Sequence, residues 1–227
     1  MNKHFAVAID GPSGAGKSTL SRAVAKELGI LYVDTGAIYR TVGYHTFSKG
    51  LSLDEAAEKV ASLFGEIHIE MRYGAEGLQR MFLNGTDVTD EIRLPQISMY
   101  ASRVSALPEV RAFLLEMQRR LARENSVIMD GRDIGTVVLP DAEVKIFLTA
   151  SAEIRAKRRC AELEARGTSE PYEEVLRQIE ERDYNDTHRA AAPLRAAEDA
   201  VTVDTTELTF DQSKDAIIRV IKERLGE

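Results

Sequence analysis

A glycine-rich segment near the N-terminus constrains the fold of this 227-residue chain more than any other stretch. The segment Gly11–Ser18 has the sequence G-P-S-G-A-G-K-S and fills every fixed position of the pattern G-x-x-x-x-G-K-[ST]. The apolar run Phe5–Ile9 before it is typical of a buried strand, and Leu20, Val24 and Leu28 after it recur at helical spacing. A glycine-rich turn that merely precedes a helix is the alternative, but the full pattern in a strand–loop–helix context favours a phosphate-binding loop.

The chemistry of this loop follows from its residue types. Glycines at positions 11, 14 and 16 let backbone N–H groups curl around an anion, and the helix N-terminus adds partial positive charge. Lys17 can reach the β- and γ-phosphates, and the Ser18 hydroxyl can ligate Mg²⁺. The loop therefore predicts nucleoside triphosphate binding and leaves the reaction open.

Composition excludes several other classes of protein. A hydrophobic content of 44% and a charged content of 30% are typical of a soluble globular chain. The length of the chain fits one large α/β domain with a small insertion. The net charge of −7 argues against nucleic acid as a partner. The single cysteine, Cys160, excludes a disulfide framework, and four scattered histidines have no metal-ligand spacing.

We expect a cytoplasmic protein with no membrane association. No apolar run approaches the length of a membrane span. The N-terminus runs directly into the first strand and the phosphate loop, so cleavage of a signal peptide would remove that strand.

Five short apolar runs, separated by helical patterns, predict the core sheet. They lie at about residues 5–9, 30–33, 126–130, 144–148 and 200–204. This alternation predicts an α/β fold with a five-stranded, mostly parallel sheet and helices on both faces. Ligands of such sheets bind outside the carboxyl ends of the strands, where the phosphate loop, Asp34, Asp130 and the segment after Leu148 all fall.

Between the second and third of these runs the pattern changes to strict alternation. Residues 67–71 and 78–83 are typical of strands, with a turn at 74–77 between them. Asn84-Gly85 indicates a tight hairpin turn, and Val88 is assigned to a third short strand. We therefore expect a small antiparallel β insertion at about 65–95, carried by a core made of 1–64 and 96–227.

Two functional classes compete for a chain with this loop: a small-molecule kinase, and a regulatory GTPase or motor. The sequence has no qualifying N-K-x-D guanine-binding motif and no L-S-G-G-Q transporter signature, which favours a kinase. Within the kinases, a sugar or shikimate kinase is the alternative to a nucleotide kinase. A nucleotide-dependent switch that binds a partner is the alternative from another class.

Three further segments combine arginine with aspartate at turns of the chain. They are Asp34–Arg40, Asp130–Thr136 and Arg182–Arg189. Arginine binds phosphate in a bidentate manner, and aspartate can orient arginine or accept from a hydroxyl or amine. Each segment alone is more typical of a surface ion pair between arginine and aspartate. Their joint position near the phosphate loop favours an acceptor that itself carries a phosphate.

The segments GPSGAGKS, VDTGAIYR, DGRDIGTVV and ERDYNDTHR, followed by Ala192-Pro193-Leu194, resemble those of the bacterial cytidylate (CMP) kinases. The resemblance covers essentially the whole chain, including the β insertion. It implies transfer of the γ-phosphoryl group of ATP to CMP or dCMP, giving ADP and CDP or dCDP, with Mg²⁺, in pyrimidine nucleotide metabolism. It also implies an adenylate-kinase-like P-loop fold with a core, an acceptor-binding insertion and a short lid, and we expect a monomer.

The resemblance also implies roles for individual residues. The ATP phosphates would be held by Gly11, Pro12, Ser13, Gly14, Ala15, Gly16, Lys17, Ser18 and Thr19. The CMP phosphate would contact Arg40, Arg132 and Arg189, and the cytosine edge Ser102, Arg111 and Asp133. Asp186, supported by Arg182, would hold the ribose; Thr35 would lie near the sugar or phosphate and Tyr39 near the base. Mg²⁺ would be bound by Ser18, with Asp34 or Asp130 acting through water.

The reaction itself needs positioning and charge neutralisation more than covalent help from the protein. We expect Lys17, Arg132, Arg155 and Arg159 to be catalytic, and no protein nucleophile or obligatory general base. The basic stretch at about 155–170 would be the lid. Arg155 and Arg159 are the first candidates for the lid arginines that close over the transferring phosphoryl group, and Arg158 is the next. A solvated basic face is the alternative for any one of these arginines.

Overall fold

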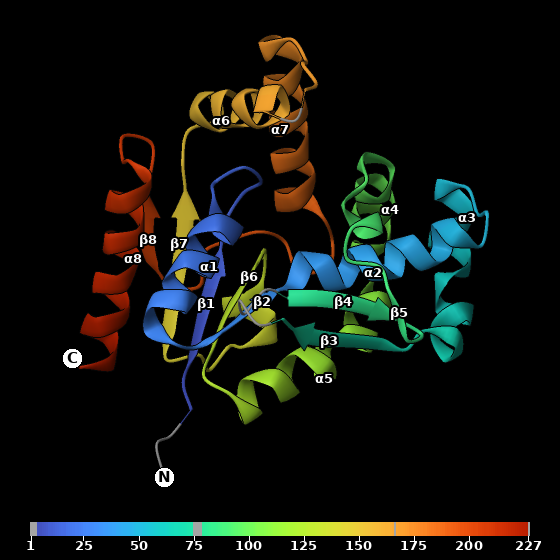
Figure 1. Ribbon diagram of the computed structural model, residues 1–227, viewed down its shortest axis with the longest axis horizontal. Coiled ribbons are helices and arrows are strands. Elements are labelled where there is room, and N and C mark those ends of the chain that lie inside the picture. Colours follow the sequence, from blue (N-terminus) through green and yellow to red (C-terminus); the bar gives the residue numbers. More distant parts are fainter. Residues whose placement is uncertain (1–3, 75–78, 166, 227) are drawn as a thin grey trace.

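The core of the protein is one parallel sheet, which the computed structural model describes together with the rest of residues 4–74, 79–165 and 167–226 (Figure 1). Its strands are β1 (Ala6–Asp10), β2 (Leu31–Asp34), β6 (Val127–Gly131), β7 (Val144–Thr149) and β8 (Val201–Asp204). They are ordered β2-β6-β1-β7-β8, and every neighbouring pair is parallel. The five-stranded sheet predicted from the apolar runs is confirmed.

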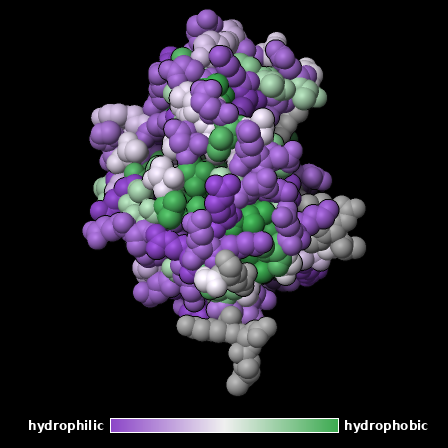
Figure 2. Space-filling view, turned by 90° about the vertical axis from the view of Figure 1, so that its left-hand side faces the viewer, coloured by the Kyte–Doolittle hydropathy of each residue, from purple (hydrophilic) through white to green (hydrophobic). Residues whose placement is uncertain are grey.

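Alternating side chains of the strands enter two separate hydrophobic clusters. Val7 and Ile9 pack with helices α1 (Lys17–Leu28) and α8 (Phe210–Leu225). Ala6 and Ala8 belong to the opposite cluster, with α2 (Thr35–Ser48) and α5 (Pro108–Glu124). Both faces of the sheet are therefore covered by helices, which explains why β1 and β6 are buried along nearly their whole length. The surface on the α8 side is mostly hydrophilic, with smaller hydrophobic areas between (Figure 2).

The expected insertion contains a second, antiparallel sheet of β3 (Ile69–Tyr73), β4 (Gln79–Leu83) and β5 (Thr86–Asp87). Asn84 and Gly85 have φ of 51° and 82°, the positive values that a tight hairpin turn between β4 and β5 requires. The assignment of Val88 to the third strand was wrong, because β5 ends at Asp87 and Val88 turns into the core, where it is 3% exposed. The turn expected at 74–77 lies largely outside the described residues.

The small sheet is attached to the main sheet at β2, its edge strand. Tyr73 and Gln79 are cross-strand partners of the hairpin. The Tyr73 hydroxyl donates to the Tyr32 carbonyl (3.1 Å), and the Gln79 amide accepts from Asp34 N–H (2.8 Å) and donates to its carbonyl (3.3 Å). Buried residues of the hairpin share one core with α2, so the two sheets pack as one body in this region. The domain limits at 65 and 95 stay a prediction.

Two further pairs of helices complete the described part of the chain. α3 (Leu53–Lys59), which runs into a 3₁₀ helix at Val60–Glu66, and α4 (Pro95–Ser105) lie beside α2. α6 (Ala152–Ala165) and α7 (Tyr172–His188) pack against each other through a separate small core and stand above the carboxyl ends of the strands (Figure 1). The Ser151 hydroxyl accepts from the Ile154 N–H (3.3 Å) at the start of α6, as an N-cap does. Among the described helices, none is long and apolar enough to cross a membrane.

Candidate active site

The phosphate loop leaves β1 at Gly11 and enters α1 at Lys17. Gly11 has φ of 151°, and a Cβ there would lie 1.9 Å from the Leu148 carbonyl oxygen of β7, so only glycine fits. Lys17 is 6% exposed, and its ammonium donates to the carbonyls of Gly11 and Pro12, both at 2.7 Å. Burial, and then the charge of Arg132, lowers the pKa of Lys17. A cation in this position is poised to exchange these carbonyls for phosphate oxygens.

Ser18 and Asp130 form the place where a magnesium ion fits. The Ser18 hydroxyl donates to Asp130 Oδ2 (2.7 Å), and the Tyr32 hydroxyl donates to Asp130 Oδ1 (3.0 Å). Burial, and then the charge of Asp34, holds the pKa of Asp130 well above its usual range. A buried carboxylate beside a hydroxyl suits a hard cation that takes its other ligands from phosphate and water. Within the described residues no cluster of three or more acidic, histidine or cysteine side chains offers a site made by the protein alone.

Asp34, the other candidate for the metal, has different partners. Its Oδ1 accepts the Ala37 N–H (2.9 Å) and caps α2, while its Oδ2 is bonded to Arg93 (2.9 Å). Thr35, expected beside the sugar or phosphate of the acceptor, is buried, and its hydroxyl donates to the Asp130 carbonyl (2.7 Å). Both residues thus hold the start of α2 against β6 and the inserted segment.

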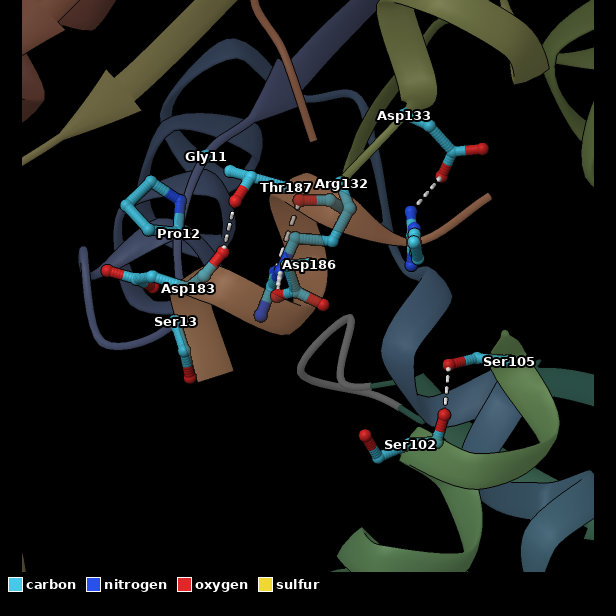
Figure 3. A network of polar contacts seen from close by, with 12 residues as sticks. Gly11, Pro12, Ser13, Ser102, Ser105, Arg132, Asp133, Asp183, Asp186 and Thr187 are labelled. Carbon is cyan, nitrogen blue, oxygen red and sulfur yellow. Dashed lines mark hydrogen bonds and ion pairs between the residues drawn. The ribbon is translucent and has the colours of Figure 1, made fainter. Parts of the chain in front are cut away.

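Several of the arginines expected around the acceptor converge on the phosphate loop. Arg132 Nε donates to Asp186 Oδ2 (2.7 Å; Figure 3). The charges of Arg132 and Arg182 add to the effect of burial on the Lys17 ammonium. Partial removal from water, and then the charge of Arg132, lowers the pKa of Arg182 to about 10, although its side chain still reaches solvent. Arg40 donates to the Ser98 hydroxyl (2.7 Å) on α4. These positive charges are only partly compensated, which is the electrostatic condition for binding a polyanion.

A second group of charges surrounds Asp133. Arg111 forms an ion pair with Asp133 and lies over the Tyr39 ring, with its guanidinium carbon 5.3 Å from the ring centre. Arg189 Nη2 lies 3.8 Å from Asp133 Oδ1, and within the described structure this buried nitrogen makes no hydrogen bond. Asp133 itself is 3% exposed. This group combines aromatic surface with donors and an acceptor, as a site for a planar polar ring requires.

Ser102 lies apart from this group. It is exposed on α4, where its carbonyl accepts from the Ser105 hydroxyl (3.1 Å), and Figure 3 shows both serines separated from Arg132, Asp133 and Asp186. In this conformation the structure brings Arg111 and Asp133 together but not Ser102 with them.

The lid arginines occupy three different environments. Arg155 is 4% exposed and is bonded to the Ala150 and Ser13 carbonyls and to the Asp183 carboxylate. Arg158 donates to the Thr205 carbonyl (2.7 Å), whereas Arg159 is half exposed and, among the described residues, bonds only to Glu162 (3.2 Å). Contact of Arg155 and Arg159 with the transferring phosphoryl group stays a prediction.

Two residues of the site were not assigned from the sequence. Asp10 is 4% exposed and accepts the N–H groups of Ile134 and Gly135, both at 2.7 Å, so it fixes the π-helical turn Ile134–Val138 behind Arg132 and Asp133. Asp183 bonds Arg155. The sequence does contain a signal for Asp10, because it is an acidic residue that ends an apolar strand directly before the phosphate loop. For Asp183 the sequence shows only that it lies among other charged residues.

Comparisons with known proteins agree with this geometry. The family model described as cytidylate kinase matches residues 7–223. A cytidylate kinase of Carboxydothermus hydrogenoformans is 50% identical over 95% of this chain and 96% of the relative. A cytidylate kinase of Caldicellulosiruptor saccharolyticus is 47% identical over 99% of this chain and 98% of the relative. Among solved structures, an uncharacterized protein from Eubacterium ventriosum shares the fold, with a TM-score of 0.52 at 16% identity over 97% of this chain and 99% of the other.

Proposed function

Because the chain belongs to the cytidylate kinase family, we propose a division of its site into a donor side, an acceptor side and the arginines between them. The protein is an ATP-dependent nucleoside monophosphate kinase: it transfers the γ-phosphoryl group of ATP to CMP or dCMP, giving ADP and CDP or dCDP. The observation that carries the proposed division is electrostatic. Arg132 and Arg182, expected at the acceptor, lie near enough to Lys17 of the phosphate loop for their charges to lower its pKa.

The donor side consists of the loop Gly11–Thr19. Its backbone N–H groups and Lys17 bind the ATP phosphates, and Ser18 with Asp130 would hold Mg²⁺. When bound, the metal ion neutralises phosphate charge. The hydrogen bond between Ser18 and Asp130 supports this pair over Ser18 with Asp34, because Asp34 is already engaged by Ala37 and Arg93.

The acceptor side lies across the sheet edge. Arg40, Arg132 and Arg189 bind the CMP phosphate; the buried Arg189 Nη2, which makes no hydrogen bond within the described residues, supports this role. Asp186 with Arg182 binds the ribose, and Arg111 with Asp133 binds the cytosine edge against Tyr39. In the same proposal Thr35 lies near the sugar or phosphate of CMP. Ser102 contacts the cytosine edge after a movement of α4 toward the base. Asp133 accepts from the cytosine amino group, whereas uracil would present it with a carbonyl oxygen.

In the transfer step the protein positions the reactants and stabilises charge. Lys17 and Arg132 contact the phosphoryl group from opposite sides, and Arg159 of the lid approaches from solvent to exclude water. No protein nucleophile or general base is required, because the phosphate of CMP is itself the attacking group. The monomeric state and cytoplasmic location remain predictions.

One coupled assay of ADP release tests this function. It compares CMP, dCMP, UMP, AMP, shikimate and no acceptor at fixed ATP and Mg²⁺. We expect kcat/KM for CMP and dCMP to exceed that for UMP by about tenfold or more, because an unpaired buried acceptor costs more than 1 kcal/mol. Fast ADP release without an acceptor would instead indicate a nucleotide-dependent switch, and a preference for shikimate a kinase of another acceptor.

A further inference from the structure

Helix α7 is linked to both sides of the site, to the donor loop through Arg155 and to the acceptor loop through Arg132. Asp186 on α7 is bonded to Arg132, which follows β6. Three residues earlier on the same helix, Asp183 is bonded to Arg155, which contacts the phosphate loop. Arg155 Nη1 contacts both Ser13 and Asp183, and Figure 3 shows Asp186 beside Arg132. Only the second of these carboxylates has a part in the function proposed above.

The contacts between Asp183 and Arg155 are bidentate. Arg155 Nη2 donates to Asp183 Oδ2 (2.6 Å), and Nη1 donates to Oδ1 (3.1 Å). The Arg155 side chain is 5% exposed and that of Asp183 is 25% exposed. A paired fork of this kind fixes the plane of the guanidinium as well as its position.

Arg155 also donates to two backbone carbonyls, of which one belongs to the phosphate loop. Nη1 donates to the Ser13 carbonyl (3.0 Å), and Nε donates to the Ala150 carbonyl (2.9 Å) at the end of β7. The Arg155 Cβ would lie 3.3 Å from a Cβ placed on Gly14, so the arginine stem packs directly against the loop. Arg155 therefore braces Ser13 and Gly14 from α6, and Asp183 determines where Arg155 lies.

We propose that Asp183 is a positioning residue for the ATP phosphates. It acts through Arg155, which it holds against the Ser13 carbonyl, so that the loop keeps the conformation in which its N–H groups converge. Without the carboxylate, Arg155 keeps a buried charge with no compensating partner, and its fork is free to leave the loop. This inference rests on the proposed function, because it assumes that the loop binds the phosphoryl donor.

The test compares Asp183→Asn with Asp186→Asn, two isosteric changes three residues apart on one helix. For Asp183→Asn we expect the Kd and the KM of ATP to rise about tenfold, and the KM of CMP to change by less than about twofold. For Asp186→Asn we expect the opposite pattern, because that carboxylate faces the acceptor. A loss of stability alone would not separate the two substrates in this way.

A second substitution at the same position keeps the test informative if Asp183→Asn folds poorly. Asp183→Glu retains the charge but moves it by one methylene, and we expect it to raise the Kd of ATP by about threefold while the thermal midpoint stays near that of the wild type. The proposal is overturned if both variants bind ATP as the wild type does, or if either raises the KM of CMP as much as that of ATP.

ATP binding is measured by calorimetry in the absence of CMP, on the full chain with Mg²⁺. A wild-type protein that binds ATP but shows no CMP-dependent ADP release would contradict the proposed function and leave the comparison of Kd values valid. A wild-type protein active with CMP, together with unchanged ATP binding in Asp183→Asn and Asp183→Glu, would contradict only the role of Asp183.

Discussion

Asp10 shows how a single buried carboxylate can organise two loops. It ends β1 directly before the phosphate loop, and its two oxygens accept the N–H groups of Ile134 and Gly135 behind Asp133. The donor loop and the acceptor loop are therefore tied to each other through one side chain. Burial raises the pKa of Asp10 to about 6, while the hydrogen bonds from Gly135 and Ile134 oppose this shift.

The raised pKa of Asp10 makes stability depend on pH in a defined direction. The folded protein binds this proton more tightly than the unfolded chain, whose carboxyl has its ordinary value of 3.8. The resulting stabilisation is complete below that value and is lost as the pH rises through about 6. Relative to Asp10→Asn, we expect the wild type to lose about 2 kcal/mol of unfolding free energy between about pH 4.5 and pH 7.5. Urea unfolding of both proteins measures this difference; an equal difference at both pH values would contradict it.

Asp133 carries the prediction about base specificity. In Asp133→Asn the carboxylate is replaced by an amide, which can donate to the uracil carbonyl as well as accept from the cytosine amine. We expect the ratio of kcat/KM for CMP to that for UMP to fall by about tenfold or more. Asp141→Asn, at an exposed position, is the control and should leave the ratio as it is. An unchanged ratio in Asp133→Asn would remove this residue from base recognition.

At the scale of elements, the contact between α2 and α4 depends on one glycine. A Cβ on Gly43 of α2 would lie 2.7 Å from the Ala101 backbone nitrogen and 3.0 Å from the Tyr100 carbonyl carbon. Backbone atoms cannot move aside as a flexible side chain does, so the two helices would have to separate. α4 also carries Ser98, the partner of Arg40, and this packing therefore positions part of the acceptor side.

We expect Gly43→Ala to destabilise the protein by about 1–3 kcal/mol, because it overfills this helix contact. Gly65→Ala is a matched control, since Gly65 also lies in a helical segment and a Cβ there meets no atom within 4 Å. That control should change the unfolding free energy by less than about 1 kcal/mol. Chemical denaturation of the three proteins decides the point, and equal effects of the two substitutions would argue against close packing as the cause.

Elements that local chemistry specifies were predictable from the sequence. The five strands are short, mostly apolar segments between helical patterns, and the Asn84-Gly85 turn needs the positive φ values that these residues tolerate. Val88 was misassigned because an apolar residue after a hairpin fits a strand and a core position equally well, and tertiary packing decided between them.

The arrangement within the site was less predictable, because it depends on partners far apart in the chain. Helical spacing placed Arg155 and Arg159 on one face of α6, yet one is buried against Ser13 and Asp183 and the other reaches solvent. The difference comes from the partners that Arg155 meets, the Asp183 carboxylate of α7 and the Ser13 carbonyl of the phosphate loop. Likewise, no pattern in the sequence distinguishes Asp130 from Asp34 as the partner of Ser18.

At the scale of the whole molecule, charge is distributed unevenly. The chain has a net charge of −7, yet Lys17, Arg132, Arg182 and Arg189 gather at one edge of the sheet. Burial, together with the charge of Arg132, lowers the pKa of Lys17, Arg182 and Arg189 there. An acidic surface repels anionic nucleotides at long range, and this cluster attracts them at short range. The site therefore depends on charges that salt can screen.

We expect the Kd of CMP to rise about fivefold or more when KCl is increased from about 50 mM to about 500 mM, because screening shortens the reach of the arginine charges. Cytidine is the control, since it keeps the base and the ribose but lacks the phosphate, and its Kd should change by less than about twofold. Calorimetry with both ligands measures the two values. An equal effect of salt on CMP and cytidine would contradict the proposed phosphate contacts.

The attachment of the small sheet to β2 has a consequence for the behaviour of this protein at high concentration. An outer strand of a sheet offers a row of unsatisfied backbone groups, and a strand of another molecule can pair with them. Here the Tyr73 hydroxyl and the Gln79 amide already satisfy the outward groups of Tyr32 and Asp34. The inserted hairpin thus closes this margin of the sheet against strand exchange and aggregation between copies, independently of any part it has in binding nucleotide.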